Sequence, residues 1–128
     1  METRYLTLEN VIDIHDWQIE QFGGAPGVRD AGLIEAALLR PQTGYYADVL
    51  EEAAALWESL TMNPGFVDGN KRIGFAATYI FLRLNGYLLT PGAGQTTEFV
   101  LTSLESNTFT KDKLNEWLRN NVAEKRID

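Results

Sequence analysis

The stretch from Ile73 to Leu84 constrains the fold of this chain more than any other segment. It places apolar residues on nearly every side of a helix. A helix that is apolar all round has to be enclosed by other elements, because any open side would expose its side chains. The pair Asn85-Gly86 follows and is typical of the left-handed turn that ends a helix. We therefore predict a helix over 73–84 at the centre of a helical bundle.

Five further segments show the three- and four-residue spacing of amphipathic helices. Capping residues and Pro41 predict their limits, which are, in chain order, Thr7 to Phe22, Asp30 to Pro41, Asp48 with Glu51 to Leu60, Thr96 or Thr97 to Leu104, and Thr110 to Val122. No segment shows the alternation that predicts a strand. The sequence thus predicts an all-α fold, a compact single-domain bundle of about six helices spanning residues 1–128.

Charge and composition exclude several classes of function. The net charge is −7, which argues against direct nucleic-acid binding and against attachment to anionic membranes. The chain has no cysteine, so disulfides, thiol catalysis and cysteine-ligated zinc are excluded. The first residues lack the apolar stretch of a signal peptide, and we expect a cytoplasmic protein.

The loop before the central helix carries most of the chemical information. It places Lys71 and Arg72 at a helix start, where cations are unfavourable unless an anion binds there. Helix N-terminal amides, with Gly69 for close approach, favour a phosphate site, and Asn70 could bond phosphate oxygens. Asp68 is an oxygen ligand suited to Mg²⁺ beside a polyphosphate. The competing interpretation is an ordinary Asp-Gly-Asn turn followed by a solvated basic patch.

The run from Phe66 to Arg72, Phe-Val-Asp-Gly-Asn-Lys-Arg, resembles the signature of the death-on-curing (Doc) toxins of the Fic-fold superfamily. The resemblance extends to most of residues 5–120. It includes Phe81 to Tyr87 after the loop and, upstream, His15-Asp16, Phe22-Gly23-Gly24, Gly27 to Asp30 and Leu33 to Pro41. It implies the all-helical Fic/Doc fold and the toxin of a bacterial two-gene toxin–antitoxin module.

The resemblance also implies a chemistry for the loop. Doc-type members transfer the terminal phosphate of ATP to a threonine of elongation factor Tu, whereas Fic members transfer AMP. Lys71 follows the Doc pattern, so a kinase is expected and an AMP transferase is the alternative. Carried over by position, Asp68 would bind Mg²⁺, and Gly69, Asn70, Lys71 and Arg72 would cradle the phosphates of ATP. Phe66 would anchor the loop.

The sequence departs from the family at one decisive position. The family's loop begins with a histidine that takes the proton from the incoming hydroxyl, and Pro64 stands at that place, or Asn63 if one residue is inserted. Neither side chain is a base near neutral pH. A positioned general base typically contributes about 10²–10⁴-fold in rate. We therefore predict a chain that binds nucleotide and transfers phosphate slowly or not at all, with a pseudoenzyme that binds an antitoxin as the alternative.

The partners follow from the same resemblance. The self-inhibitory segment of many Fic proteins is absent, because the only glutamate followed by Gly or Asn is Glu9 and Tyr5 precedes it by four residues. This fits a toxin restrained by a separate Phd-like antitoxin whose C-terminal segment folds into a groove on the toxin. Tyr45 and Tyr46 are candidates for a flap that docks the target segment.

Two sets of aromatic side chains are open to a structural or a functional interpretation. His15, the only histidine, is either a partly buried structural residue with one satisfied hydrogen bond or a residue that supports the active-site loop without contacting the substrate. The tryptophans Trp17, Trp57 and Trp117 are interpreted as core residues first and as partner contacts second.

Three charged residues outside the loop are interpreted as structural. Glu51 and Glu52 are carboxylates that favour a helix start, and Arg83 is a cation near a helix end.

Overall fold

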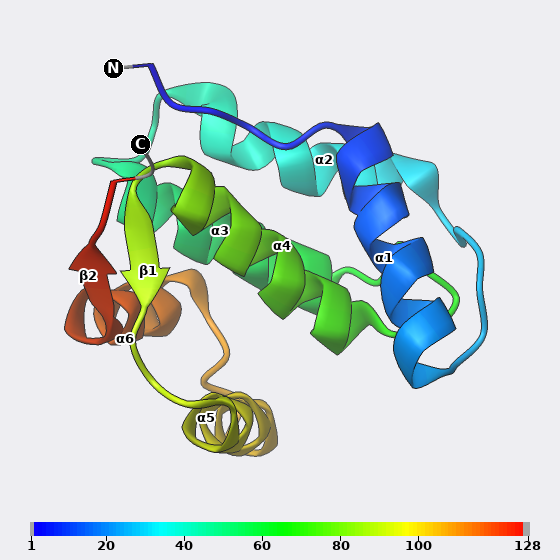
Figure 1. Ribbon diagram of the computed structural model, residues 1–128. Coiled ribbons are helices and arrows are strands. Elements are labelled where there is room, and N and C mark those ends of the chain that lie inside the picture. The colour runs from blue at the N-terminus through cyan, green and yellow to red at the C-terminus, as the bar shows by residue number, and fades with distance from the viewer. Residues whose placement is uncertain (1, 127–128) are drawn as a thin grey trace.

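The computed structural model describes residues 2–126, and within them it contains six α-helices, one 3₁₀ turn and two short strands. Figure 1 shows the elements, which are, in chain order, α1 (Leu8–Phe22), α2 (Ala31–Leu39), η1 (Arg40–Thr43), α3 (Val49–Met62), α4 (Asn70–Leu84), β1 (Tyr87–Leu89), α5 (Ala93–Glu105), α6 (Lys111–Asn121) and β2 (Val122–Glu124). The all-α prediction is confirmed. No helix in residues 2–126 is both long and apolar enough to cross a membrane.

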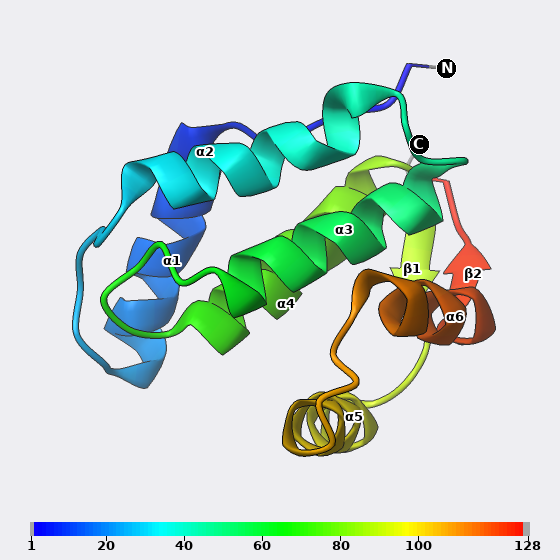
Figure 2. The same cartoon turned by 180° about the vertical axis from the view of Figure 1, so that it is seen from behind.

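Helix α4 lies in the middle of the molecule, as predicted, but it is not enclosed on every side. It packs along α3, with α1 near its start, and Figures 1 and 2 show these helices from the front and from behind. Its inward face is fully buried at Ile73, Ala77 and Phe81. Tyr79 and Leu84 each remain 37% exposed, so the neighbouring elements do not cover the whole surface of this helix.

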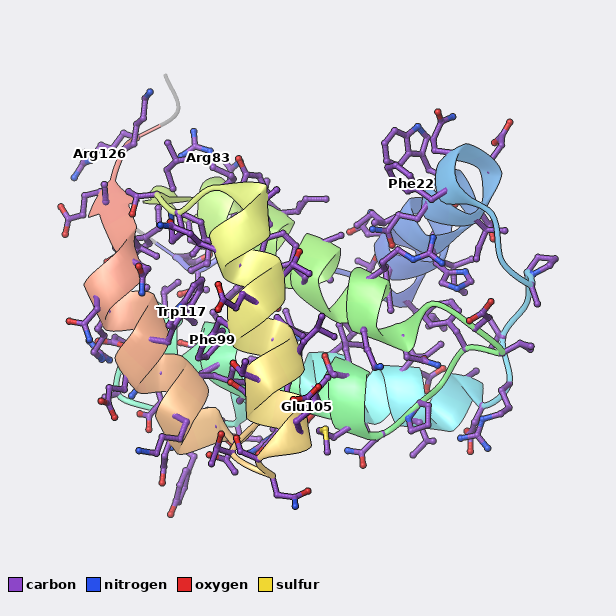
Figure 3. All side chains as sticks on the ribbon, turned by 90° about the horizontal axis from the view of Figure 1, so that it is seen from below. Phe22, Arg83, Phe99, Glu105, Trp117 and Arg126 are labelled. Atoms are coloured by element: carbon purple, nitrogen blue, oxygen red, sulfur yellow. The ribbon has the colours of Figure 1, made fainter. Side chains whose placement is uncertain are left out.

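An aromatic cluster around Trp57 joins α3 to the C-terminal helices. Trp57 is 0% exposed, and its ring packs against the rings of Phe75, Phe99, Phe109 and Trp117. The Phe99 and Trp117 rings stack with centroids 4.5 Å apart between α5 and α6 (Figure 3). This cluster connects α5 and α6 to the rest of the core.

The prediction that all three tryptophans are core residues is wrong for Trp17. Its side chain is 56% exposed and packs edge-on against Phe22, which is 66% exposed. The apolar side of α1 is wider than the strip that the bundle covers. Its last turn therefore carries two aromatic rings into solvent.

Most predicted helix starts are confirmed by capping hydrogen bonds. The side chains of Thr7, Asp30, Asp48 and Thr110 each accept from a main-chain N–H three residues later. Two helices differ: α4 begins at Asn70, three residues before the predicted start at Ile73, and α5 begins at Ala93 and not at Thr96 or Thr97. There the Thr96 hydroxyl donates to the Gly92 carbonyl 3.1 Å away, inside the first turn, so the threonine is part of the helix and not its cap.

A small antiparallel ladder corrects the expectation of a chain without strands. Tyr87–Leu89 pairs with Val122–Glu124, so Val122 belongs to a strand and not to the last helix, and Glu124 is held in that ladder. Arg83 fixes the same region by donating to the Lys125 carbonyl at 2.9 Å, which confirms its structural role. Three-residue strands are too short to show an alternation in the sequence. They form because the fold brings two distant segments together.

Gly74 lets α4 approach α3 closely. A Cβ atom at this position would collide with the buried Thr61 Oγ1. We expect Gly74→Ala to lower the free energy of unfolding by about 1–3 kcal/mol through overpacking. Adding Thr61→Ala should recover most of that loss because it removes the colliding hydroxyl.

Urea unfolding of the single and double variants checks this expectation. Gly94→Ala is the matched control, because Gly94 lies in α5 with no atom within 4 Å of its Cβ position. In that open site alanine favours the helix and should be neutral or stabilising by up to about 1 kcal/mol. Equal effects of Gly74→Ala and Gly94→Ala would show that the close approach of the two helices carries no cost.

Candidate functional site

The loop 63–69 connects the end of α3 to the start of α4 and lies beside α1 (Figures 1 and 2). Phe66 anchors it, as predicted: its side chain is 2% exposed, and its ring stacks on that of His15 with centroids 3.8 Å apart. The Val67 N–H donates to the Gly27 carbonyl at 3.0 Å, and Phe66 and Val28 form an isolated antiparallel bridge. The loop is therefore held from one side by α1 and from the other by the segment after it.

Asn70 fixes the shape of the loop through both ends of its amide. Its Oδ1 accepts from the Phe66 N–H, and its Nδ2 donates to the Phe66 carbonyl, both at 3.1 Å. These two bonds use one acceptor and one donor of the side chain and leave its second N–H for another partner. Asn70 thus acts as a latch of the loop, and its predicted bond to a phosphate oxygen stays a prediction.

Asp68 presents an ionised carboxylate at the surface of the loop. Its Oδ2 accepts from the Ala25 N–H at 3.0 Å, and its Oδ1 accepts from the Gly69 N–H at 2.8 Å. These backbone bonds, that of Ala25 foremost, hold the pKa of the carboxyl below its usual value, with a smaller contribution from the Arg72 charge. Each carboxylate oxygen accepts one amide and keeps a lone pair for a further partner.

The residues that could hold Mg²⁺ fit a metal that arrives with a phosphate ligand. Asp68 supplies the hard, charged oxygen that Mg²⁺ prefers. Within residues 2–126 no group of three or more His, Asp or Glu side chains is placed to hold a metal ion. Mg²⁺ bound at Asp68 would therefore complete its coordination with waters and phosphate oxygens, as it commonly does beside nucleotides.

Lys71 and Arg72 lie in the first turn of α4 and share one concave surface with Asp68. A hollow of about 460 Å³ is lined by Thr61 and by residues 67–72. Gly69 is the N-cap, with φ of +76°, and no side chain caps this helix. The first-turn N–H groups of a helix have no partner within it, and they attract an anion. The structure thus brings Asp68, Gly69, Lys71 and Arg72 together as the sequence predicts.

A second hollow, of about 540 Å³, adjoins the first on the far side of the two cations. Its lining is mostly apolar and comes from three helices: Gln18 and Phe22 of α1, Lys71, Arg72 and Phe75 of α4, and Ala93, Thr96, Thr97, Val100 and Leu101 of α5. Figure 3 shows Phe22 at the end of α1, across from α5. We call this hollow the apolar groove.

Pro64 lies at the exposed start of the loop, at the position of the expected proton acceptor. Its ring offers no acid or base, and its carbonyl accepts from Arg29 Nε at 3.1 Å. The Asp30 N–H, one residue further on, donates to the Gly65 carbonyl at 2.9 Å. The main chain at this position is therefore fixed by the segment 29–30, while its side chain contributes no chemistry.

The turn after α1 supplies contacts that sequence reasoning missed. Ala25 donates to Asp68, and Arg72 Nη1 donates to the Gly23 carbonyl at 3.2 Å. Gly24 lies so close that a Cβ there would be 2.8 Å from Asp68 Oδ2. The Gly23-Gly24 pair, used in the sequence analysis only for the family resemblance and the end of a helix, was the available signal, since two adjacent glycines permit a backbone to pass close to another group.

Tyr45 and Tyr46 do not lie at the loop, and their role in docking the target segment stays a prediction. They precede Asp48, the N-cap of α3, whereas the loop begins at Asn63, at the other end of that helix. A helix of 14 residues separates the two ends by about 21 Å. Tyr46 instead accepts from Arg40 Nε at 2.7 Å, and Tyr45 is 86% exposed. Glu51 and Glu52 are structural, as predicted: Glu51 accepts from the Ala47 N–H and Glu52 from the Tyr5 hydroxyl.

Comparison with known sequences identifies the family. The sequence model of the Fic/DOC family matches residues 5–82, which include α1, the loop and nearly all of α4. The chain belongs to the Fic/DOC family. The resemblance inferred from the loop, from His15-Asp16 and from the Gly23-Gly24 turn is thereby confirmed.

Two curated members of the family are similar to this chain. The protein named Toxin Doc from Mycolicibacterium smegmatis is 42% identical over 92 residues, which are 68% of this chain and 68% of that protein. The protein named Protein kinase doc from Escherichia phage P1 is 33% identical over 87 residues, 65% of this chain and 69% of that protein. The family assignment thus points to the Doc branch, which the motif with Lys71 had predicted.

Proposed function

We propose that this chain is a cytoplasmic Doc-type toxin of a bacterial toxin–antitoxin module and that its loop binds ATP and Mg²⁺. The reaction is transfer of the γ-phosphate to a threonine of a translation factor of the elongation factor Tu type, which blocks translation. One observation carries the proposal: Asp68, Lys71 and Arg72 face one hollow at the N-terminus of α4. The names of the two relatives, a toxin and a protein kinase, support it.

Each residue of the loop has a role that follows from its position. The first-turn amides of α4 and the close backbone at Gly69 receive phosphate oxygens. Lys71 and Arg72 neutralise the phosphate charge, and Arg72, which Gly23 holds through one N–H, keeps further donors for a bidentate contact. Asp68 holds Mg²⁺, which when bound neutralises charge that develops on the transferred phosphate.

The absence of a base at Pro64 limits the reaction. The hydroxyl of the target threonine must lose its proton as it attacks phosphorus, and the proline ring cannot accept one. We therefore propose that the chain binds nucleotide but transfers phosphate slowly. The second candidate is a pseudoenzyme that only binds its antitoxin, and the lack of a base at Pro64 favours it as well. The third candidate is a transferase of AMP.

The proposed protein partner is a Phd-like antitoxin, and the apolar groove is the surface that suits it. An amphipathic helix can bury its apolar face against Phe22, Phe75 and Leu101. Phe22 and Leu101 are 66% and 47% exposed, so both have apolar surface to lose on binding. Lys71 and Arg72 at the edge of the groove favour an acidic residue on the partner. A helix bound in the groove would lie beside the proposed phosphate site, residues 68–72, which we call the cradle.

Calorimetric titration with ATP in the presence of Mg²⁺ tests the nucleotide part of the proposal. We expect Lys71→Met to weaken the binding by about 10- to 150-fold, because a charge-assisted hydrogen bond contributes about 1.5–3 kcal/mol. Lys113→Met is the matched control, since Lys113 is an exposed lysine of α6 away from the loop. It should leave the affinity unchanged within twofold.

Asp68→Asn separates the metal from the phosphate contacts. It should remove most of the dependence of the ATP affinity on Mg²⁺, because an amide replaces the charged ligand. No uptake of ATP by the natural chain and by its Pro64→His variant, with or without Mg²⁺, would contradict the proposal. Equal losses in Lys71→Met and Lys113→Met would show that the loop is not the binding site.

A further inference from the structure

We infer that His15 is a positioning residue that sets the orientation of the Asp68 carboxylate through the peptide between Asp68 and Gly69. The inference rests on the proposed function, since it assigns His15 to the same site. His15 is 1% exposed and lies on α1, 53 residues before Asp68 in the chain. Its Nε2 is 2.7 Å from the Asp68 carbonyl oxygen. Because a carbonyl only accepts, Nε2 carries the hydrogen and donates.

The geometry of one peptide links this bond to the carboxylate. In a trans peptide the C=O and the following N–H point in opposite directions. The carbonyl of Asp68 is turned inward to His15, so the N–H of Gly69 is turned outward, where it donates to Asp68 Oδ1 at 2.8 Å. The His15 donor therefore holds one end of a peptide whose other end orients the proposed Mg²⁺ ligand.

Stacking fixes the imidazole in the position that this bond needs. The His15 and Phe66 rings lie 13° from parallel with centroids 3.8 Å apart, and Phe66 is the buried anchor of the loop. The backbone at Gly69 lies over the imidazole, and a Cβ there would be in van der Waals contact with it, 3.6 Å from Nε2. The ring thus fills the space beneath the loop from Phe66 to Gly69, and a shift of the ring would shift both.

A second residue of α1 repeats the pattern one turn further on. Gln18 lies three residues after His15, on the same face of the helix, and its Nε2 is 3.4 Å from the Arg72 carbonyl. The turn after α1 then adds the Ala25 donor to Asp68 Oδ2. Helix α1 and its turn contact the cradle at both of its charged ends, and His15 is the buried centre of that contact.

Three substitutions at position 15 separate the hydrogen bond from the packing. His15→Gln keeps an N–H donor at a similar reach, His15→Asn shortens that amide by one carbon, and His15→Phe keeps a ring on Phe66 but has no donor. Val11→Ala is the matched control, because Val11 is a fully buried residue of α1 one turn earlier and its side chain has no hydrogen-bond donor. It lowers stability without removing the donor.

The affinity for ATP with Mg²⁺ and the hydrogen exchange rates of the Gly69 and Asn70 amides are measured for all five proteins. We expect His15→Phe and His15→Asn to bind about 2- to 10-fold more weakly, the loss of one hydrogen bond. Exchange at Gly69 should accelerate in the same two variants. His15→Gln should stay within about twofold of the natural chain in both measurements, as should Val11→Ala in affinity. If His15→Phe fails to fold, the comparison of His15→Gln with His15→Asn decides.

Each contrary result has a distinct meaning. Natural affinity in His15→Phe or His15→Asn, with unchanged exchange at Gly69, would overturn the positioning role while the proposed nucleotide site stands. An equal loss in Val11→Ala would reduce His15 to a packing residue and overturn the inference. If the natural chain binds no ATP, the proposed function fails, and faster exchange at Gly69 in His15→Phe but not in His15→Gln would still support the positioning role.

Discussion

Replacing Pro64 with histidine should raise the rate of phosphate transfer to elongation factor Tu by about 10²–10⁴-fold, the contribution of a positioned general base. The main chain is already held at this position, since Arg29 donates to the Pro64 carbonyl and Asp30 to the next one. The side chain at position 64 is exposed at the start of the loop, so an imidazole can be introduced without disturbing the core. The substitution therefore adds the missing base to a loop that keeps its shape.

Labelled ATP measures the reaction and its type. Label from the γ-phosphate on the target means phosphorylation, and label from the α-phosphate means AMP transfer. Pro64→Gln is the matched control because it is polar, of similar length to histidine, and not a base near neutral pH. Asn63→His tests the alternative register, and we expect it to be less active than Pro64→His, since Asn63 still bonds back to Ser59 at the end of α3.

The outcomes separate the three candidate functions. Growth arrest on expression of Pro64→His, with harmless expression of Pro64→Gln, supports a toxin that lacks only its base. A Pro64→His protein that binds ATP and Mg²⁺ but labels no translation factor from either phosphate would contradict the transferase and favour the antitoxin-binding pseudoenzyme. Restored activity that survives Lys71→Met would place the chemistry outside the loop.

The sequence contained most of the fold because helix limits are local. The caps Thr7, Asp30, Asp48 and Thr110 are each confirmed by a side-chain bond to a nearby N–H, which needs no information from the rest of the chain. The predicted start of α5 was wrong because a threonine can form two kinds of hydrogen bond near a helix start. Its side chain can cap the helix, or it can donate to a carbonyl four residues earlier within the first turn, as Thr96 does, and the sequence does not distinguish the two.

Contacts between distant segments could not be predicted in the same way. The ladder of Tyr87–Leu89 with Val122–Glu124 depends on where α5 and α6 return the chain. The exposure of Trp17 depends on how wide a strip of α1 the bundle covers. Both are properties of the assembled molecule, and a residue's own apolarity does not reveal them.

The candidate site was predicted in its charged residues and missed in its supports. Asp68, Lys71 and Arg72 lie within five consecutive residues, so a motif of seven residues brings them together without the fold. The donor of Ala25 and the carbonyl of Gly23 come from a turn that lies more than 40 residues earlier. Every residue except proline has the same backbone N–H group, so a sequence cannot show which backbone amide will donate to a given carboxylate.

Trp57→Ala should lower the free energy of unfolding by about 3–5 kcal/mol, the cost of removing a buried aromatic side chain. Trp57 is fully buried at the centre of the cluster that joins α3 to α5 and α6, and four rings lose their partner at once. Urea unfolding at neutral pH measures the loss. Trp17→Ala is the matched control, the same change at a ring that is 56% exposed, and we expect a change within about 0.5 kcal/mol.

Trp57→Phe keeps the test decisive if the alanine variant does not fold. The Trp57 indole N–H is buried without a hydrogen-bond partner in residues 2–126, and phenylalanine removes that polar atom while it fills most of the ring volume. We therefore expect a smaller loss than for alanine, since an unsatisfied donor is itself costly. The apolar groove is lined by α5 as well as by α1 and α4, whereas the proposed ATP site lies on the loop and α4. If Trp57→Phe loosens α5, it should therefore weaken the binding of the antitoxin more than the binding of ATP. Similar losses of stability in Trp57→Ala and Trp17→Ala would mean that the aromatic cluster does not hold the C-terminal helices.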